Sequence, residues 1–314
     1  MTEKISTKDM TYYDWLQQRR GSLGGSDVSA VLGFNKYRST YQLWLDKTGQ
    51  IEIDDDEPSE AAHFGNILEQ VVADEFVRRT GIKVRNDNKM HFKKEKPYLS
   101  ANIDRAVIGE NAFLECKTAS EWLKNDWNEE EIPTAYMLQI QHYMNVLGSD
   151  YCYIAALIGG NKFIWKKVER DQELIDLIEQ RLTDFWEVNV VKKVEPAMDG
   201  SKATEDFVNQ RYHEEGSEEL LLHHDTDEAL DTLDELKETI KQLETSKKAI
   251  ENDLKNKLGK ADANIAISPR RLIAWNAITS NRLDTKKLKE EQPEIYEKYI
   301  KQNSYKKLTI KGIE

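Results

Sequence analysis

The sequence predicts a mixed α/β (α+β) fold, with a central mixed sheet flanked by helices and a mainly helical C-terminal extension. Strand patterns alternate with helix patterns up to about residue 193, and one long helix pattern dominates after residue 226. The 314 residues are about twice the length of a usual single domain. We therefore expect a domain at residues 1–193, an irregular linker at 194–226, and a helical module at 227–314 that includes a short hairpin.

The N-terminal part begins with short helices and continues into a longer one. Residues 27–32 form a helix pattern that Gly33 ends, and residues 41–47 form another that Gly49 ends. The pattern at residues 61–80 is longer. Its apolar residues recur at spacings of three and four, which predicts one buried face made of Phe64, Ile67, Leu68, Val71, Val72, Phe76 and Val77.

The middle of the chain contains the strands. Five segments have strand patterns: 83–92, 99–107, 112–118, 151–158 and 162–168. The last two flank Gly159-Gly160-Asn161, which is typical of a hairpin turn. Three further segments are expected to be helical: 122–131, 133–147 and 172–192.

The C-terminal part has a different pattern. Residues 194–216 are irregular, whereas residues 227–258 form one long helix pattern that ends at Gly259. A hairpin is expected within residues 261–277 and a helix at residues 284–301. The long helix has an apolar seam suited to packing on another helix. Its members are Leu233, Leu236, Ile240, Leu243, Ile250 and Leu254, with Lys247 as the one break.

Composition narrows the class of protein. The mean hydropathy is −0.72, and the longest apolar run, at residues 151–158, is too short to span a membrane. Two cysteines cannot form a disulfide framework. The first ten residues lack the apolar core of a signal peptide. We expect a cytoplasmic protein without a membrane partner, and no phosphate-binding loop of the ATPase type.

Charge is unevenly distributed along the chain. The net charge is −12, which by itself disfavours a nucleic-acid partner. However, residues 78–105 contain nine Lys or Arg and three acids, whereas residues 214–235 contain ten acids and no Lys or Arg. A basic face in the first part of the chain and an acidic segment elsewhere remain compatible with DNA binding.

The most informative residues are Asp104, Glu115 and Lys117. Alternate residues of a strand point to the same face, so Glu115 and Lys117 share one face of the strand at residues 112–118. A short turn at residues 109–111 can bring Asp104 beside Glu115. Two converging carboxylates favour a hard divalent cation such as Mg²⁺, and a lysine beside them can orient a water or stabilise charge on a phosphate. An exposed charged hairpin would give the same pattern.

Two helices carry further polar residues. Glu69 lies on the helix at residues 61–80, where it can reach the metal, hold Lys117, or remain a solvated glutamate. Gln139 and Tyr143 lie one turn apart on the helix at residues 133–147, and Gln141 lies between them. These three side chains suit phosphate or a metal-bound water, although an amphipathic helix surface would look similar.

The segment at residues 19–27 combines two arginines, three glycines and two serines. It leads directly into a helix start, where free backbone N–H groups bind phosphate. Arg19 adds bidentate contacts, and Ser26 or Asp27 can cap the helix. We therefore expect Arg19 and Ser26 to contact a phosphate group.

The order of these motifs resembles the YqaJ-type viral recombinase family, whose members are similar to the lambda exonuclease of the PD-(D/E)xK nuclease superfamily. The motifs are Arg-x₆-Ser, Gly-x₃-Glu, Asp…Glu-x-Lys and Gln-x-Gln, and the resemblance covers residues 15–192. It implies a restriction-endonuclease-like core and a Mg²⁺-dependent 5′-to-3′ exonuclease acting on double-stranded DNA ends. Mn²⁺ is expected to substitute for Mg²⁺.

The resemblance also implies roles for the metal-site residues. Asp104 and Glu115 would ligate Mg²⁺ together with the backbone carbonyl of Cys116. Lys117 would act on the attacking water. Glu69 would support the lysine or a second metal.

The remaining roles concern DNA and protein partners. Gln141, with Gln139, would place the water or the phosphate. Arg19 and Ser26 would hold the 5′-terminal phosphate, with Asn102 and Tyr143 as further contacts. The family implies a homotrimeric ring and a partner protein that anneals the 3′ single strand. The C-terminal module lies beyond the resemblance, and we expect it to serve trimer packing or to dock that partner.

One departure and two alternatives stay open. Asn102 stands where lambda exonuclease has a serine, so the details of the phosphate pocket can differ. A PD-(D/E)xK endonuclease would carry the same core, but the Arg19 and Ser26 motif favours end binding. A DNA-binding or scaffold protein with a degenerate site is disfavoured by the intact Asp104, Glu115 and Lys117.

Overall fold

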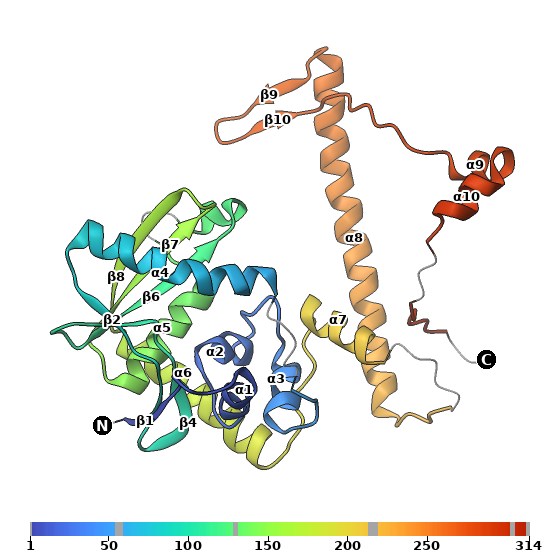
Figure 1. The fold of residues 1–314 in the computed structure, drawn as a ribbon. Helices are drawn as coiled ribbons and strands as arrows, with labels where there is room; N and C mark the ends of the chain where they lie inside the picture. Colours follow the sequence, from blue (N-terminus) through green and yellow to red (C-terminus); the bar gives the residue numbers. More distant parts are fainter. Residues whose placement is uncertain (1, 54–58, 128–130, 213–218, 302–304, 312–314) are drawn as a thin grey trace. The chain divides into compact units, whose positions relative to one another are not determined.

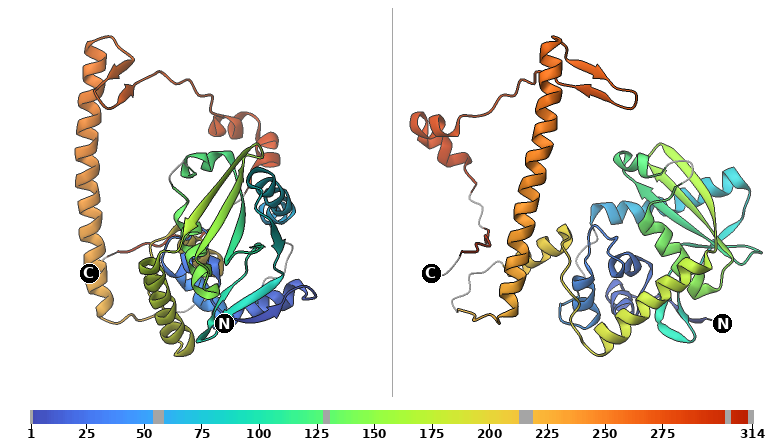
Figure 2. Two further views of the ribbon diagram at one scale, coloured as in Figure 1. Left: turned by 90° about the vertical axis from the view of Figure 1, so that its left-hand side faces the viewer. Right: turned by 180° about the vertical axis from the view of Figure 1, so that it is seen from behind.

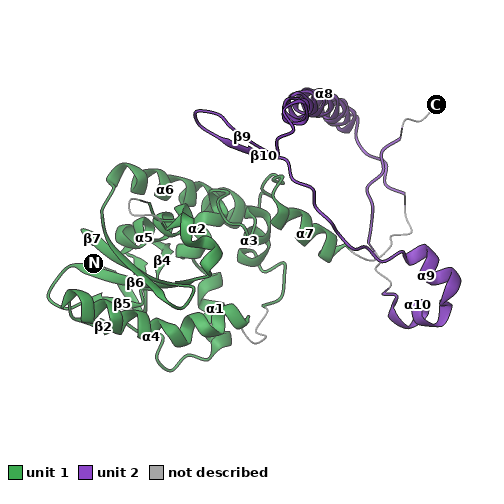
Figure 3. Cartoon of the chain, turned by 90° about the horizontal axis from the view of Figure 1, so that it is seen from above, with its two compact units in different colours: residues 1–212 green, residues 213–314 purple. Residues whose placement is uncertain are grey.

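The computed structural model describes residues 2–53, 59–127, 131–212, 219–301 and 305–311. The chain divides into two compact units, residues 1–212 and residues 213–314 (Figure 3). The first unit is mixed α/β, and the second is mainly helical (Figure 1). No helix in the described ranges has both the length and the apolar character needed to cross a membrane.

The first unit contains two sheets. A three-stranded antiparallel sheet has the order β1-β3-β4, with β1 at Glu3–Ser6, β3 at Lys89–Lys93 and β4 at Lys96–Ala101. The larger sheet is five-stranded with the order β2-β5-β6-β7-β8. Its strands are β2 (Val84–Asn86), β5 (Arg105–Val107), β6 (Ala112–Ala119), β7 (Tyr151–Ile158) and β8 (Lys162–Glu169).

The larger sheet is mixed, as the sequence predicts. The β6 and β7 strands are parallel, and every other neighbouring pair is antiparallel. The turn between β7 and β8 uses Gly159 and Gly160, both at positive φ. This is a conformation that side chains disfavour, so the glycine pair permits the hairpin.

Helices cover both faces of this sheet (Figure 2). The helix α4 (Glu60–Thr80) packs Val72 and Phe76 against Leu114 and Cys116 of β6. The opposite face, which includes Phe113, packs against a group of helices. These are α2 (Gly25–Val31), α3 (Thr40–Lys47), α5 (Thr134–Leu147) and α6 (Gln172–Asp184).

The remaining helices of the first unit complete this layer. The helix α1 (Tyr12–Arg20) precedes α2, and α6 continues into π-helical turns at Phe185–Val191. The helix α7 (Lys202–Arg211) ends the unit, with Phe207 packed against Tyr41 of α3. The segment expected to be irregular at 194–216 is therefore partly helical, and its residues 213–216 lie outside the described ranges.

Three further expectations about the first unit need correction. The strand expected at 83–92 is two strands in different sheets, because Asn88 has positive φ and redirects the chain. The strand expected at 99–107 likewise divides into β4 and β5. The helix expected at 122–131 is a short 3₁₀ helix, η1 (Glu121–Asp126), and residues 128–130 of that prediction lie outside the described ranges.

The buried face predicted for the helix at 61–80 is also wrong in its first half. Phe64, Ile67 and Val71 are each at least half exposed, whereas Val72, Ala73 and Phe76 are buried. The buried apolar side chains of α4 are therefore confined to its C-terminal half, although Gly65 in the first half still lies near Thr118 of β6. The periodicity was sufficient to predict the helix but not which of its apolar side chains are buried.

The second unit consists of one long helix followed by small elements. The helix α8 (Asp225–Lys260) has 36 residues. A hairpin of β9 (Ile265–Ile267) and β10 (Leu272–Ala274) follows it, as expected. The single helix expected at 284–301 is two helices, α9 (Thr285–Glu291) and α10 (Pro293–Tyr299), because Pro293 begins a new helix.

Candidate active site

The β5–β6 hairpin places Asp104 beside the middle of β6. Arg105 pairs with Leu114 and Ala106 with Phe113, so Asp104, just before β5, lies next to Glu115. The carboxylate of Asp104 accepts a hydrogen bond from the backbone N–H of Cys116 at 2.7 Å. This bond fixes the carboxylate at the edge of β6.

Glu115 and Lys117 occupy the same face of β6, and both are largely enclosed. The Glu115 side chain is 2% exposed and that of Lys117 is 18% exposed. The ammonium of Lys117 donates to Glu115 Oε1 at 2.6 Å and lies 5.1 Å from the centre of the Tyr136 ring. The pair therefore does not lie at a solvent edge of the strand, because β6 is the central strand of the sheet.

The electrostatics of this group favour an additional positive charge. Burial, together with the nearby Glu115, raises the pKa of Asp104 well above its ordinary value. Burial also raises the pKa of Glu115, although Lys117 opposes this shift. The two carboxylates raise the pKa of Lys117 despite its burial, which keeps the ammonium protonated.

One atom of this group has no bonding partner. Glu115 Oε2 is buried and makes no hydrogen bond to any of the described residues. A buried carboxylate oxygen without a partner is costly unless a cation or water meets it. Asp104, Glu115 and the backbone carbonyl of Cys116 are oxygen donors of the kind that Mg²⁺ prefers. The residues present therefore fit a divalent cation.

Glu69 of α4 reaches the same region but pairs with a residue that the sequence reading missed. It forms an ion pair with Arg105, whose guanidinium also donates to Gln70 at 3.1 Å. Its negative charge contributes to the raised pKa values of Asp104 and Glu115. Glu69 is thus near the carboxylates, and Arg105, not Lys117, holds it. In the sequence, the only sign of this ion pair was a basic residue, Arg105, directly after Asp104.

The two glutamines of α5 separate into different roles. Gln139 donates to Glu115 Oε1 at 2.6 Å, so it belongs to the carboxylate group. Gln141 is buried and bonds the Glu169 carbonyl at 2.9 Å and the Asp171 N–H at 3.0 Å. The interpretation that placed Gln141 first at the reacting centre needs correction, because its amide is used to join α5 to the start of α6.

This difference predicts opposite phenotypes for the two glutamines. Gln139→Ala is expected to slow DNA cleavage by about 10-fold or more with little change in stability, because it removes a donor to Glu115. Gln141→Ala is expected to lower the free energy of unfolding by about 1–3 kcal/mol, because it removes the hydrogen bonds from the buried Gln141 amide to the Glu169 carbonyl and the Asp171 N–H. Cleavage rates and urea unfolding of both variants check this. Equal rates for the two variants would contradict the separation.

The N-terminal segment lies at the same place in the fold. Arg19 donates to Ser26 at 2.7 Å, so the two residues predicted to act together are neighbours. Gly25 lies against α5, and a Cβ at this position would be 2.5 Å from Gln139 Cγ and 2.7 Å from the Tyr143 ring. Only glycine permits this approach. Tyr143 is therefore buried beneath Gly25, and burial beside Glu115 raises its pKa.

A buried ion pair supports this segment, and the sequence reading missed its second partner. Asp27 is bonded to Lys47 of α3 at 2.9 Å and also accepts from the Gly24 N–H at 3.0 Å. Lys47 also donates to the Arg19 carbonyl at 2.7 Å. The pair thus fixes both ends of the loop that carries Arg19 and Ser26. The sequence reading took Asp27 only as a cap.

Asn102 lies in the connection between β4 and β5. Its side-chain oxygen is buried and has no partner among the residues that the structure describes. It is two residues from Asp104, but no bond links it to Arg19 or Ser26. Its predicted contact with phosphate stays a prediction.

A cavity of about 760 Å³ opens beside these residues. Ser26, Tyr136, Gln139, Phe34, Tyr37 and Trp127 are among its lining residues, and of these Gln139 is bonded to Glu115. Tyr37 is almost fully exposed. A space of this size, joined to the carboxylate group through Gln139, can admit a nucleotide-sized group.

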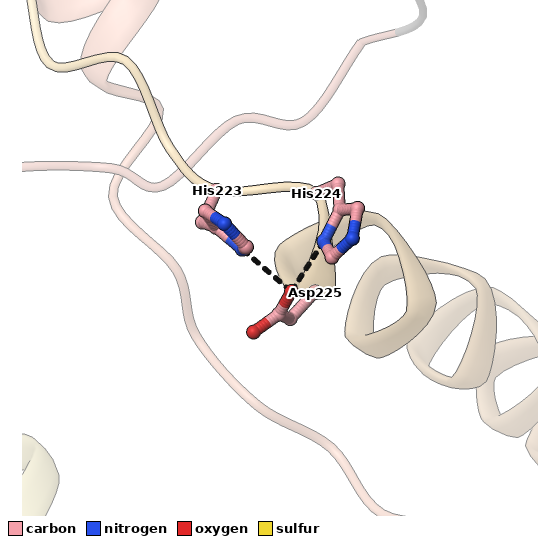
Figure 4. A group of neighbouring side chains, drawn as sticks. All are labelled: His223, His224 and Asp225. Carbon is pink, nitrogen blue, oxygen red and sulfur yellow. Dashed lines mark hydrogen bonds and ion pairs between the residues drawn. The ribbon is translucent and has the colours of Figure 1, made fainter.

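A second group with metal-ligand atoms lies in the other unit. His223 and His224 both contact Asp225 at the start of α8, with the His223 contact at 2.6 Å (Figure 4). The three side chains are consecutive in the sequence and fully open to solvent.

A helix-flanked mixed sheet with Asp, Glu and Lys on adjoining strands defines a protein of the PD-(D/E)xK type. The comparison with known sequences names the family. The chain belongs to the YqaJ-like viral recombinases: the model of the YqaJ-like viral recombinase domain matches residues 14–150. That range contains every residue predicted for the site.

The chain is similar to one curated relative and to several solved structures. The "Uncharacterized protein YqaJ" of Bacillus subtilis (strain 168) is 42% identical over 308 residues, which is 97% of this chain and 96% of the relative. Among solved structures, the alkaline exonuclease LHK-Exo of Laribacter hongkongensis is 20% identical with a TM-score of 0.46, covering 58% of this chain and 96% of that one. A putative exonuclease from Eubacterium rectale is 11% identical with a TM-score of 0.44, covering 68% and 96%.

Proposed function

We propose that this protein is a Mg²⁺-dependent 5′-to-3′ exonuclease that acts on double-stranded DNA ends in the cytoplasm of a bacterial host. The observation that carries the proposal is the enclosed group of Asp104, Glu115 and Lys117, with a buried Glu115 oxygen that has no partner among the described residues. Such a group is unfavourable for stability and suits phosphodiester hydrolysis. Membership of the viral recombinase family supports the DNA substrate.

The residues would divide the work as follows. Asp104 and Glu115 hold the cation, with the Cys116 carbonyl as a further ligand and Glu69 close to both. A bound Mg²⁺, or Mn²⁺ in its place, would supply Lewis-acid activation of the phosphate and of a water. Lys117 positions that water or meets the charge that develops on the phosphate.

The neighbouring residues would orient the DNA. Gln139 holds Glu115 and faces the cavity. Arg19 and Ser26, already bonded to each other, offer a guanidinium and a hydroxyl for the 5′-terminal phosphate. Asn102 and Tyr143 are the further contacts that the family resemblance suggests.

Two partners complete the proposal. We infer that the nuclease unit works as a homotrimeric ring around DNA, which is the arrangement that the family resemblance implies. The 3′ single strand that it leaves would pass to a single-strand annealing protein for phage-type recombination. The second unit is the segment available for such docking.

Linear duplexes with 5′-phosphate or 5′-hydroxyl ends, together with a closed circle, test the proposal in Mg²⁺. We expect digestion from the 5′ ends, an intact circle, and digestion of the hydroxyl end that is slower by about 10-fold or more, since a charged contact is lost. Arg19→Ala should reduce the difference between the two ends. Digestion from the 3′ ends, or no metal-dependent digestion, would refute the proposal.

The alternative within the same class is an endonuclease that cuts internally. The same experiment separates the two, because an endonuclease opens the closed circle. The hydrogen bond between Arg19 and Ser26 favours an exonuclease that binds DNA ends. A binding or scaffold protein without catalysis would leave all three DNA substrates intact at every Mg²⁺ concentration.

A further inference from the structure

The long helix of the second unit presents an apolar seam whose middle is left uncovered by the described residues of that unit. Leu236, Ile240, Leu243 and Ile250 of α8 are each more than half exposed. A helix of 36 residues is about 54 Å long. Such a helix depends on packing of its apolar face for most of its stability. The seam therefore requires a partner.

The spacing of the seam specifies the kind of partner. From Leu233 to Leu254 the apolar residues alternate steps of three and four, with only Lys247 interrupting. This is the a and d pattern of a coiled coil, in which a single polar residue at one a position fixes the register. The partner is therefore another helix of matching length and pattern.

The charge distribution identifies that helix. Residues 225–241 contain seven acids and two lysines, a net charge of −5, whereas residues 242–260 contain three acids and five lysines, a net charge of +2. Two copies side by side in parallel would place acidic half against acidic half. Two antiparallel copies place each acidic half against a basic half, and the helix dipoles also oppose. We propose that α8 pairs with α8 of a second copy of this chain in an antiparallel coiled coil.

One register satisfies the seam best. With the two-fold axis between Lys241 and Gln242, Ile240 faces Leu243 of the second copy. In the next layers, Leu233 faces Ile250, and Leu236 faces Lys247. Each Lys247 is therefore surrounded by the acidic half of the other copy. Lys237 and Glu244, which flank the seam, then lie diagonally across from each other and are complementary in charge.

Disulfide cross-linking of the full-length protein tests both the pairing and its direction. Leu236→Cys and Lys247→Cys are made singly and together. The two positions are about 16 Å apart along one helix, too far for an internal disulfide. The natural cysteines, Cys116 and Cys152, are buried, so the wild-type chain serves as the oxidation control.

We expect the double variant to form a covalent dimer that thiol reverses, and neither single variant to do so. Dimers of both single variants would show a parallel pair and overturn the proposed arrangement. The absence of dimers in all three variants would also overturn it, and would assign the seam to another occupant, such as the first unit or an annealing protein.

This inference goes beyond the proposed nuclease and does not depend on it. The readout is the covalent mass of the chain, and none of the substituted residues lies in the candidate active site. A protein that cross-links but does not cut DNA would retain the pairing and lose the nuclease. A protein that cuts DNA but does not cross-link would retain the proposed nuclease and overturn the pairing. With a trimeric ring, antiparallel pairing would join two rings and double the mass of the assembly.

Discussion

Lys117→Ala is expected to lower the rate of DNA cleavage by about 10²- to 10³-fold, because it removes an enclosed cationic donor from the reacting centre. The Lys117 ammonium lies 2.6 Å from Glu115 Oε1 and packs over the Tyr136 ring. Both contacts hold it in one position, and the two carboxylates keep it protonated by raising its pKa. Initial rates on a 5′-phosphorylated linear duplex at saturating Mg²⁺ measure the loss.

The chain offers a matched control for this variant. Lys167 of β8 also pairs with a glutamate two residues away, Glu169, at 2.8 Å, but this pair lies on the exposed surface of the same sheet. Lys167→Ala should cleave DNA at nearly the wild-type rate, because exposed pairs contribute little. Circular dichroism and thermal unfolding establish that both variants are folded. A folded Lys117→Ala protein that cleaves within about twofold of wild type would remove Lys117 from the mechanism.

The sequence was sufficient for the parts of the site that follow from strand geometry. Alternation along residues 112–118 puts Glu115 and Lys117 on one face, and a short turn puts Asp104 beside them. The pairing of β5 with β6 agrees with this, because Arg105 lies opposite Leu114. These relations are local, so periodicity and turn length determine them. The mixed sheet with flanking helices follows from the same patterns.

The parts that could not be predicted depend on contacts between distant elements. Gln139 and Gln141 point from different sides of α5, one to Glu115 and the other to the Glu169 carbonyl. The packing of the helix on the sheet decides which side meets which partner. Lys47 reaches Asp27 only because α3 folds against α2. The exposure of Phe64 likewise depends on which face of α4 meets the sheet. Helical periodicity cannot report any of these, because it describes one segment at a time.

Asp27→Ala is expected to lower the free energy of unfolding by about 3–5 kcal/mol, because it leaves the buried ammonium of Lys47 without its counter-ion. The side chains of Asp27 and Lys47 are 1% and 2% exposed. Burial alone would raise the pKa of Asp27, but the charges of Lys47, Arg19 and Arg38 outweigh it and lower the pKa to about 2. Urea unfolding monitored by tryptophan fluorescence measures the loss.

The direction of the pKa shift gives this prediction a pH dependence. A carboxyl whose pKa is lowered in the folded state stabilises the protein above its ordinary pKa, and this contribution is lost as the pH falls through the folded value. The difference in stability between wild type and Asp27→Ala should therefore be constant near neutral pH and shrink between about pH 4 and about pH 2.

A second substitution separates the ion pair from the other contacts of Asp27. Lys47→Met removes the buried charge and keeps a similar apolar stem, so Asp27→Ala with Lys47→Met should be more stable than Asp27→Ala alone. A double variant as unstable as the single one would mean that the Gly24 N–H bond, and not the ion pair, is what Asp27 contributes. In either case the loop bearing Arg19 and Ser26 is held by a residue that contacts no substrate. Asp27→Ala should therefore also reduce the difference in digestion rate between 5′-phosphate and 5′-hydroxyl ends.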